Sequence, residues 1–203
     1  VHAILLGGGR LARLRDGASD ENAWQLRYGL DAVLAIPEET PVIARPQDGQ
    51  TVAEVLPLGR FTDPGSVRGF QALNDGVMGG VSEGGLGFST AEECAVFAGI
   101  VRTEYNGGFS SVRLQDDYPD VSGYTGFYLD CQSSDPSKVW SLVIKDVAAV
   151  MQQTNFKAQF QAPGPGAFGR VLIPFAALGP PERFGRPVQR PGMDWAALGE
   201  VGL

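Results

Sequence analysis

From Phe61 to the end of the chain, short apolar stretches alternate with segments rich in Gly, Pro, Asn and Ser. The alternation is clearest in residues 156–161, where Phe156, Ala158 and Phe160 fall on one side of an extended chain. A period of two residues predicts β-strands with one buried face. The candidate strands are Leu86–Ser89, Ala95–Arg102, Phe109–Leu114, Tyr124–Cys131, Val139–Lys145, Asn155–Gln161 and Gly169–Pro174.

Residues typical of tight turns separate these candidate strands, for example Gly107-Gly108 and Pro163–Gly166. Several short strands at near-regular spacing predict an all-β sandwich. Its core is expected to contain Trp140, Phe156 and Phe160.

Residues 1–59 follow a different pattern. An apolar start runs into three consecutive glycines, and spacing close to 3.6 residues predicts a helix from Asp20 to about Ala35. Prolines at positions 37, 41 and 46 then indicate an extended linker. We therefore expect an irregular, partly helical N-terminal arm over residues 1–59 and a β-sandwich domain over residues 60–203.

Composition narrows the function classes. The chain has 203 residues, and its 28 Gly and 14 Pro favour short strands joined by turns. Its net charge of −7 argues against a nucleic-acid-binding surface. It contains no run of apolar residues long enough to cross a membrane. Because it starts with Val rather than Met, we expect it to begin after a cleaved targeting segment or inside a longer chain.

The chain has only two cysteines, Cys94 and Cys131, and one histidine, His2. This set excludes a zinc site and disfavours a Ser-His-Asp or Cys-His centre. We predict that both cysteines are buried free thiols. No catalytic residue, metal site or cofactor is expected.

Two glycine-rich segments are the most distinctive in the chain, residues 73–82 and 104–113. Asn74 and Asp75 are expected to fix the first as a tight loop by capping nearby backbone amides. Asn106-Gly107 in the second is a turn signal followed at once by a strand. Arg113 is expected to pair with Asp75 or Glu104.

These motifs resemble a known family. N-D-G-V-M-G-G-V-S at 74–82, then F-x-G, then N-G-G-F-S-S-V-R at 106–113 are similar to the complex I intermediate-associated protein 30 family, as are Y-x-G-hydrophobic at 124–127 and V-x-I-P-F at 171–175. The resemblance implies a galactose-binding-like jelly-roll domain from about Phe61 onward. Since residues 198–203 match only the start of the family's final strand, the domain is expected to lack its last strand.

The resemblance further implies a non-catalytic accessory subunit or assembly factor of a large membrane redox complex, either a photosystem or an NADH dehydrogenase-type complex. The form of the first motif favours the photosynthetic or bacterial branch, and hence the chloroplast thylakoid over the mitochondrial inner membrane. The expected partners are protein subunits, with the chain peripheral to the membrane and no nucleic acid or small-molecule substrate. The candidate partner-binding residues are Asn74, Asp75, Met78, Asn106, Arg113 and Trp195.

Two alternatives stay open. One is a carbohydrate- or small-ligand-binding module, with Tyr105, Tyr118 and Tyr124 available for stacking; residues 116–120 carry three Asp, which we interpret as solvated loop charges rather than a calcium site. The other is a remnant nucleotide-binding protein of the short-chain-dehydrogenase-like type. Gly7-x-Gly9-x-x-Ala12 after an apolar stretch fits the dinucleotide fingerprint, although its wider context is missing.

Overall fold

A computed structural model of the protein describes residues 2–6, 9–13, 54–166 and 168–203. Most of this chain forms antiparallel β-strands. The strands are β1 (His2–Leu6), β2 (Gly9–Arg13), β3 (Glu54–Gly59), β4 (Gln71–Asn74), β5 (Glu83–Ser89), β6 (Cys94–Ile100), β7 (Ser110–Gln115), β8 (Gly126–Ser133), β9 (Val139–Asp146), β10 (Phe156–Gln161), β11 (Gly169–Pro174), β12 (Glu182–Arg183), β13 (Arg186–Pro187) and β14 (Leu198–Gly202). The helical elements are α1 (Val147–Gln152) and the 3-10 turns η2 (Asp75–Met78), η3 (Glu104–Asn106), η4 (Phe175–Ala177) and η5 (Trp195–Ala197).

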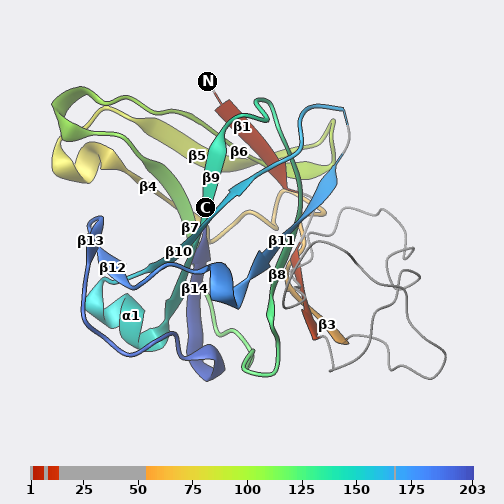
Figure 1. Cartoon of the computed structure of the whole chain (residues 1–203). Coiled ribbons are helices and arrows are strands. Elements are labelled where there is room, and N and C mark those ends of the chain that lie inside the picture. The colour runs from red at the N-terminus through yellow and green to blue at the C-terminus, as the bar shows by residue number, and fades with distance from the viewer. Residues whose placement is uncertain (1, 7–8, 14–53, 167) are drawn as a thin grey trace.

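Two sheets face each other across the core (Figure 1). The first has the order β3-β2-β8-β1-β6-β5, with β11 also paired to β8, and the second has the order β10-β9-β14-β7-β4. The short β12–β13 hairpin stands beside the second sheet. The prediction of an all-β, antiparallel fold is confirmed, and the jelly-roll subtype stays a prediction.

The core lies between the sheets because alternate residues of each strand point inward. On β9, Trp140 and Ile144 are buried in the core while Ser141 points to the other face. Phe97 on β6 contacts Trp140 on β9, with their ring centroids 5.9 Å apart, and this pair connects the two sheets. Trp140, Phe156 and Phe160 are all buried, as predicted.

The seven strands expected from the alternation all form, within two or three residues of the expected ends. The strand pattern did not predict β1 to β4, α1 or the β12–β13 hairpin. β14 coincides with residues 198–203, which the family resemblance already assigned to the start of a final strand. The helix α1 starts where the Asp146 carboxylate accepts a 2.6 Å hydrogen bond from the Ala149 N–H, which is a normal N-cap.

The described part of the N-terminal segment is strand rather than irregular arm. β1 lies between β6 and β8 in the first sheet, and Ile4 is completely buried in the core. β2 continues along β8, where Leu11 is opposite Phe127, and also pairs with β3. The expected helix at 20–35 and the proline linker lie outside the described residues, and the domain boundary near residue 59 stays a prediction.

This geometry contradicts the dinucleotide-binding interpretation of Gly7–Ala12. That motif needs a helix whose N-terminus faces the pyrophosphate. Residues 9–13 instead form β2, whose backbone groups are used in pairing with β3. Gly9 therefore begins a strand and not a phosphate-binding loop.

The last described strand is an interior one. β14 pairs with β9 on one side and β7 on the other, and Leu198 is buried in the core. Among the described strands, the edges of this sheet are β10 and β4. Leu198–Gly202 thus form a strand inside the sheet, and the absence of a further strand stays a prediction.

Cys94 on β6 and Cys131 on β8 are both buried and unpaired with each other, as predicted. Burial raises the pKa of both thiols, that of Cys131 to about 12, because a thiolate is poorly solvated there.

A thiol-specific reagent near pH 8 should therefore label the native chain very slowly, and after denaturation two thiols per chain should react with it. Fast labelling of the native chain would contradict this packing.

Candidate partner-binding site

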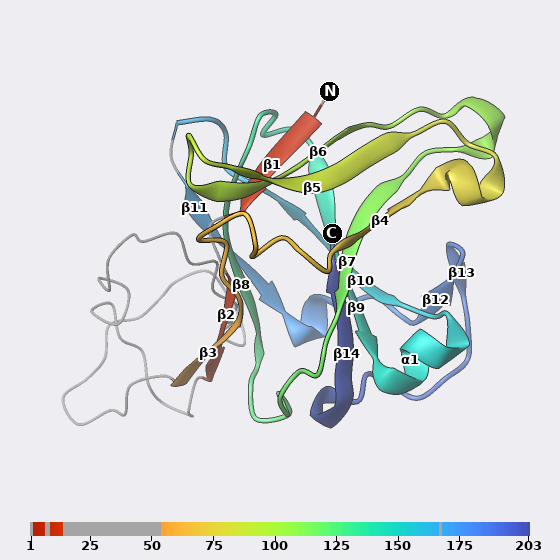
Figure 2. The same cartoon turned by 180° about the vertical axis from the view of Figure 1, so that it is seen from behind.

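The two glycine-rich segments lie side by side at one end of the sandwich, at the short yellow coil that follows β4 and the loop between β6 and β7 (Figures 1 and 2). The Asp75 side chain joins them. Its Oδ2 accepts hydrogen bonds from the backbone N–H groups of Gly108 (2.6 Å) and Phe109 (3.3 Å). Its Oδ1 accepts one from the Ser82 N–H (2.8 Å), and the Ser82 hydroxyl donates a short one to Oδ2. We call this arrangement the Asp75 clasp.

The clasp explains why the motifs need glycine at two positions. A Cβ at Gly80 would lie 2.4 Å from Cγ of Asp75, and one at Gly107 would lie 2.5 Å from its Oδ2. Both distances are shorter than non-bonded contacts of a Cβ atom in real proteins, so a side chain at either position would displace the carboxylate. Gly79 has a φ of 89°, which also favours glycine.

The Asp75 carboxylate is completely buried, at 0% exposure. Burial by itself raises its pKa, but the hydrogen bonds from Ser82 and from the N–H groups of Gly108 and Phe109 outweigh this effect. The pKa of Asp75 therefore lies below its ordinary value, and the group stays ionised at neutral pH. Ser82 extends the clasp, because its Oγ accepts a 2.9 Å hydrogen bond from the Arg102 N–H.

Asn74 plays a related role with different partners. Its Oδ1 accepts a 2.7 Å hydrogen bond from the Ser110 hydroxyl, and its Nδ2 donates to the Gly84 carbonyl at 3.2 Å. The expectation that both residues cap backbone amides is thus confirmed for Asp75, whereas Asn74 connects β4 to β5 and β7. Both residues position the loops, and their role as partner contacts stays a prediction.

Arg113 does not pair with Asp75 or Glu104, so that prediction is wrong. Its Nη1 lies 3.3 Å from the Glu200 carboxylate on β14. The reason is the register of the sheet, because Arg113 is opposite Gly202 on β14 and points to the face away from the core. Asp75 is already occupied by the loop amides.

Glu200 is the centre of a buried polar cluster. Lys145 Nζ lies 2.7 Å from its Oε1, and Gln115 Nε2 donates to its Oε2 at 2.8 Å. Burial raises the pKa of Glu200, but the hydrogen bonds of Lys145 and Gln115 and the charges of Lys145 and Arg113 lower it more, so its pKa lies below the ordinary value.

Large apolar side chains cover the outside of the clasped loops. Val77 is 70% exposed, Met78 50% and Tyr105 75%, and Val81 and Val101 are each 40% exposed. We call these five residues the apolar tip. Tyr105 has a φ of 55°, an unusual value for a tyrosine in a turn. The side chain of Asn106 lies outside the described residues.

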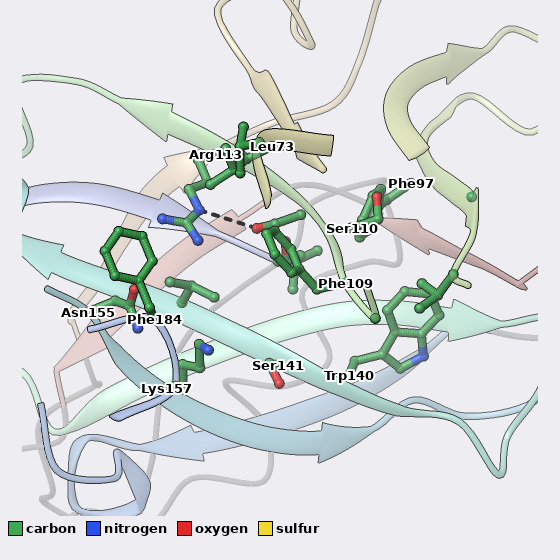
Figure 3. A pocket seen from close by; sticks show the side chains of 18 of the residues that line it. Leu73, Phe97, Phe109, Ser110, Arg113, Trp140, Ser141, Asn155, Lys157 and Phe184 are labelled. Atoms are coloured by element: carbon green, nitrogen blue, oxygen red, sulfur yellow. Dashed lines mark hydrogen bonds between the residues drawn. The ribbon is translucent and has the colours of Figure 1, made fainter. Parts of the chain in front are cut away.

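Beside the apolar tip lies a groove of about 800 Å³, lined mainly by the face of the second sheet that points away from the core (Figure 3). Residues 97–99 of β6 and Trp140 complete its lining. Val77, Met78 and Gly107–Phe109 form one wall, and Phe184 of the β12–β13 hairpin stands on the other side. Its floor and ends carry alternate residues of β7, β9 and β10, namely Ser111, Arg113, Ser141, Val143, Lys145 and Lys157. Sequence reasoning missed this groove, although the alternation in residues 156–161 already assigned Lys157 to the face opposite Phe156.

The remaining predicted residues have other surroundings. Trp195 stacks on Phe175 with ring centroids 3.5 Å apart, half buried against its own domain, and its role as a partner contact stays a prediction. Tyr118 and Tyr124 pack against the core, which leaves Tyr105 as the exposed member of the three expected tyrosines. Within the described ranges, no group of three or more His, Cys, Asp or Glu side chains is placed to hold a metal ion.

These features define a β-sandwich domain that presents a surface from two loops locked to each other. The family model described as Complex I intermediate-associated protein 30 matches residues 59–203, and the chain belongs to this family. The resemblance drawn from the glycine-rich motifs is therefore confirmed. None of the curated proteins compared with the chain matches it. Among the described residues, none of the helices has the length and hydropathy needed to cross a bilayer.

The clasp predicts that Asp75→Asn lowers the melting temperature by roughly 5 °C or more, because the amide presents N–H donors to other donors. In the wild type, the contribution of Asp75 is complete above its unfolded pKa of about 3.9 and is lost as the pH falls through the lower folded pKa. The variant should therefore lose less stability than the wild type on acidification. Thermal melts from pH 7 to pH 3 measure both effects.

Asp116→Asn is the matched control, because Asp116 is exposed and, among the described residues, its side chain accepts a hydrogen bond from the neighbouring Asp117 N–H alone. Its melting temperature should stay close to that of the wild type. If Asp75→Asn melts like this control, the two loops do not depend on the clasp.

Proposed function

We propose that the chain is a non-catalytic accessory subunit or assembly factor of an NADH dehydrogenase-type membrane redox complex, which it binds through the apolar tip. The family is associated with complex I assembly, which supports this complex over a photosystem. The mitochondrial inner membrane follows as the matching location. The chloroplast thylakoid stays a prediction with no support from the family match.

The observation that carries the proposal is the combination of exposure and rigidity at the apolar tip. Exposed clusters of large apolar side chains mark interaction surfaces on folded proteins. Here Val77 and Met78 project from a turn whose first residue, Asp75, is fixed by four hydrogen bonds to the rest of the loops. A surface that is fixed before binding loses little conformational entropy on association.

Methionine suits such a surface because its side chain adapts to the shape of a partner. Tyr105 adds an aromatic ring with a polar end, a type enriched where proteins bind each other. Of the six candidate residues from the sequence, Met78 is the one that belongs to the apolar tip and is proposed to touch the partner there, while Asn74 and Asp75 hold it in place. Asn106, Arg113 and Trp195 stay predictions.

The double variant Val77→Ser/Met78→Ser should reduce the recovery of the chain with the detergent-extracted membrane complex by roughly tenfold or more. It removes apolar contact area without touching the clasp. Affinity purification of tagged chains from membranes, followed by quantification of NADH dehydrogenase subunits, measures the effect.

The control is Val147→Ser/Met151→Ser, which removes the same two residue types from exposed positions of α1 at another part of the surface (Figures 1 and 2). This control should co-purify like the wild type. Equal recovery of both double variants would overturn the role of the apolar tip, and recovery with a photosystem would assign the chain to that complex.

A further inference from the structure

The groove over the second sheet carries an excess of positive charge. Arg113, Lys138, Lys145 and Lys157 line it, against Glu182 in the lining and Glu200 beneath it. Lys157 forms an ion pair with Glu182. The chain as a whole has a net charge of −7, so this positive groove stands out against an acidic molecule.

The cations at the floor are held in place. Lys145 and Arg113 share one carboxylate, that of Glu200, at 2.7 and 3.3 Å. Arg113 Nε also donates a hydrogen bond to the Ser111 hydroxyl at 3.3 Å, the dashed line in Figure 3. Two cations on one anion leave a positive charge that no carboxylate of this cluster balances. Because Lys145 is almost completely buried, the floor is poorly screened by solvent.

Polar and apolar groups both line the groove beside these charges. Hydroxyls of Ser110 and Ser141 and the amide of Asn155 line the groove, and Val77, Met78, Val139 and Phe184 stand along it. Hydroxyl and amide groups satisfy the N–H and C=O groups of an extended backbone, while pockets between apolar groups receive alternate side chains.

We infer that this groove binds an extended acidic segment of a partner polypeptide, whose carboxylates approach Arg113, Lys138, Lys145 and Lys157. The inference rests on the proposed function, since Val77 and Met78 belong to both the apolar tip and the groove wall. The partner thus contacts the apolar tip with apolar side chains and continues into the groove with an acidic stretch. Charge complementarity of this kind increases association rate and specificity.

The lining favours a peptide over an acidic sugar. Sugar sites use aromatic rings exposed at the floor. Phe97 and Trp140 line this groove but are only 4% and 8% exposed, and Phe109 is half-buried. The one large exposed ring along the groove lining, Phe184, stands on the hairpin at the rim. An aliphatic and methionine-containing wall suits peptide side chains.

The test uses two short fluorescein-labelled peptides, one in which Glu alternates with Leu and Thr, and a copy with Gln in place of each Glu. In fluorescence anisotropy with the full chain, the acidic peptide should bind at least roughly tenfold more tightly than the Gln peptide, and added salt should weaken it. Lys138→Glu and Lys157→Glu should each weaken binding of the acidic peptide by roughly fivefold or more.

Arg68→Glu is the matched control, because it makes the same change of charge at an exposed position outside the groove lining. It should bind like the wild type. Equal affinity for the two peptides, wild-type binding by both lysine variants, or no binding of the acidic peptide would each overturn the inference. Tighter binding of an acidic oligogalacturonide than of the peptide would do the same and assign the groove to a sugar.

The outcome is separable from that of the proposed function. Loss of the membrane complex by Val77→Ser/Met78→Ser with no peptide binding leaves the tip as the binding surface and removes the groove. Peptide binding together with full recovery of that double variant in the complex keeps the groove as a binding site and removes the apolar tip.

Discussion

The carboxylate of Asp75 accepts hydrogen bonds from two loops that are about thirty residues apart in the chain, and the end of the sandwich depends on this contact. A buried carboxylate without such donors costs several kcal/mol. With them it is a fixed anchor, and the loops above it hold Val77, Met78 and Tyr105 at the surface. The glycines at 80 and 107 follow from the same constraint, because the backbone must come within contact distance of the carboxylate.

The strands of the second sheet hold the two loops that Asp75 joins. β4 leads directly into η2, and β7 starts right after Phe109, so each clasped loop continues a strand of the second sheet. The same sheet carries the buried cluster of Arg113, Lys145 and Glu200 on its outer face. The apolar tip and the positive groove are therefore parts of one surface, presented by one sheet and its loops.

Strand alternation in the sequence was sufficient to predict the all-β fold and the core rings, because burial imposes a period of two on each strand. The composition of the glycine-rich motifs indicated tight loops, and Asp75 was correctly expected to bind backbone amides. Their mutual contact was not predicted, since nothing in either segment names the other as its partner. The pairing of Arg113 with Glu200 depends on sheet register over 87 positions, which local pattern cannot supply. The Gly7–Ala12 motif was misinterpreted for a related reason, because a glycine after an apolar stretch suits both a phosphate-binding loop and the start of a second strand, as at Gly9.

The central claim is that the clasp holds a surface for a partner within an NADH dehydrogenase-type complex. A photo-crosslinking amino acid placed at Met78 in the native membrane, followed by mass spectrometry, tests it most directly. We predict cross-links to one or a few subunits or assembly intermediates of that complex, and their loss when Asp75 is replaced by Asn. Cross-links of the same yield and identity from position 151 on α1, or none from position 78, would contradict the claim.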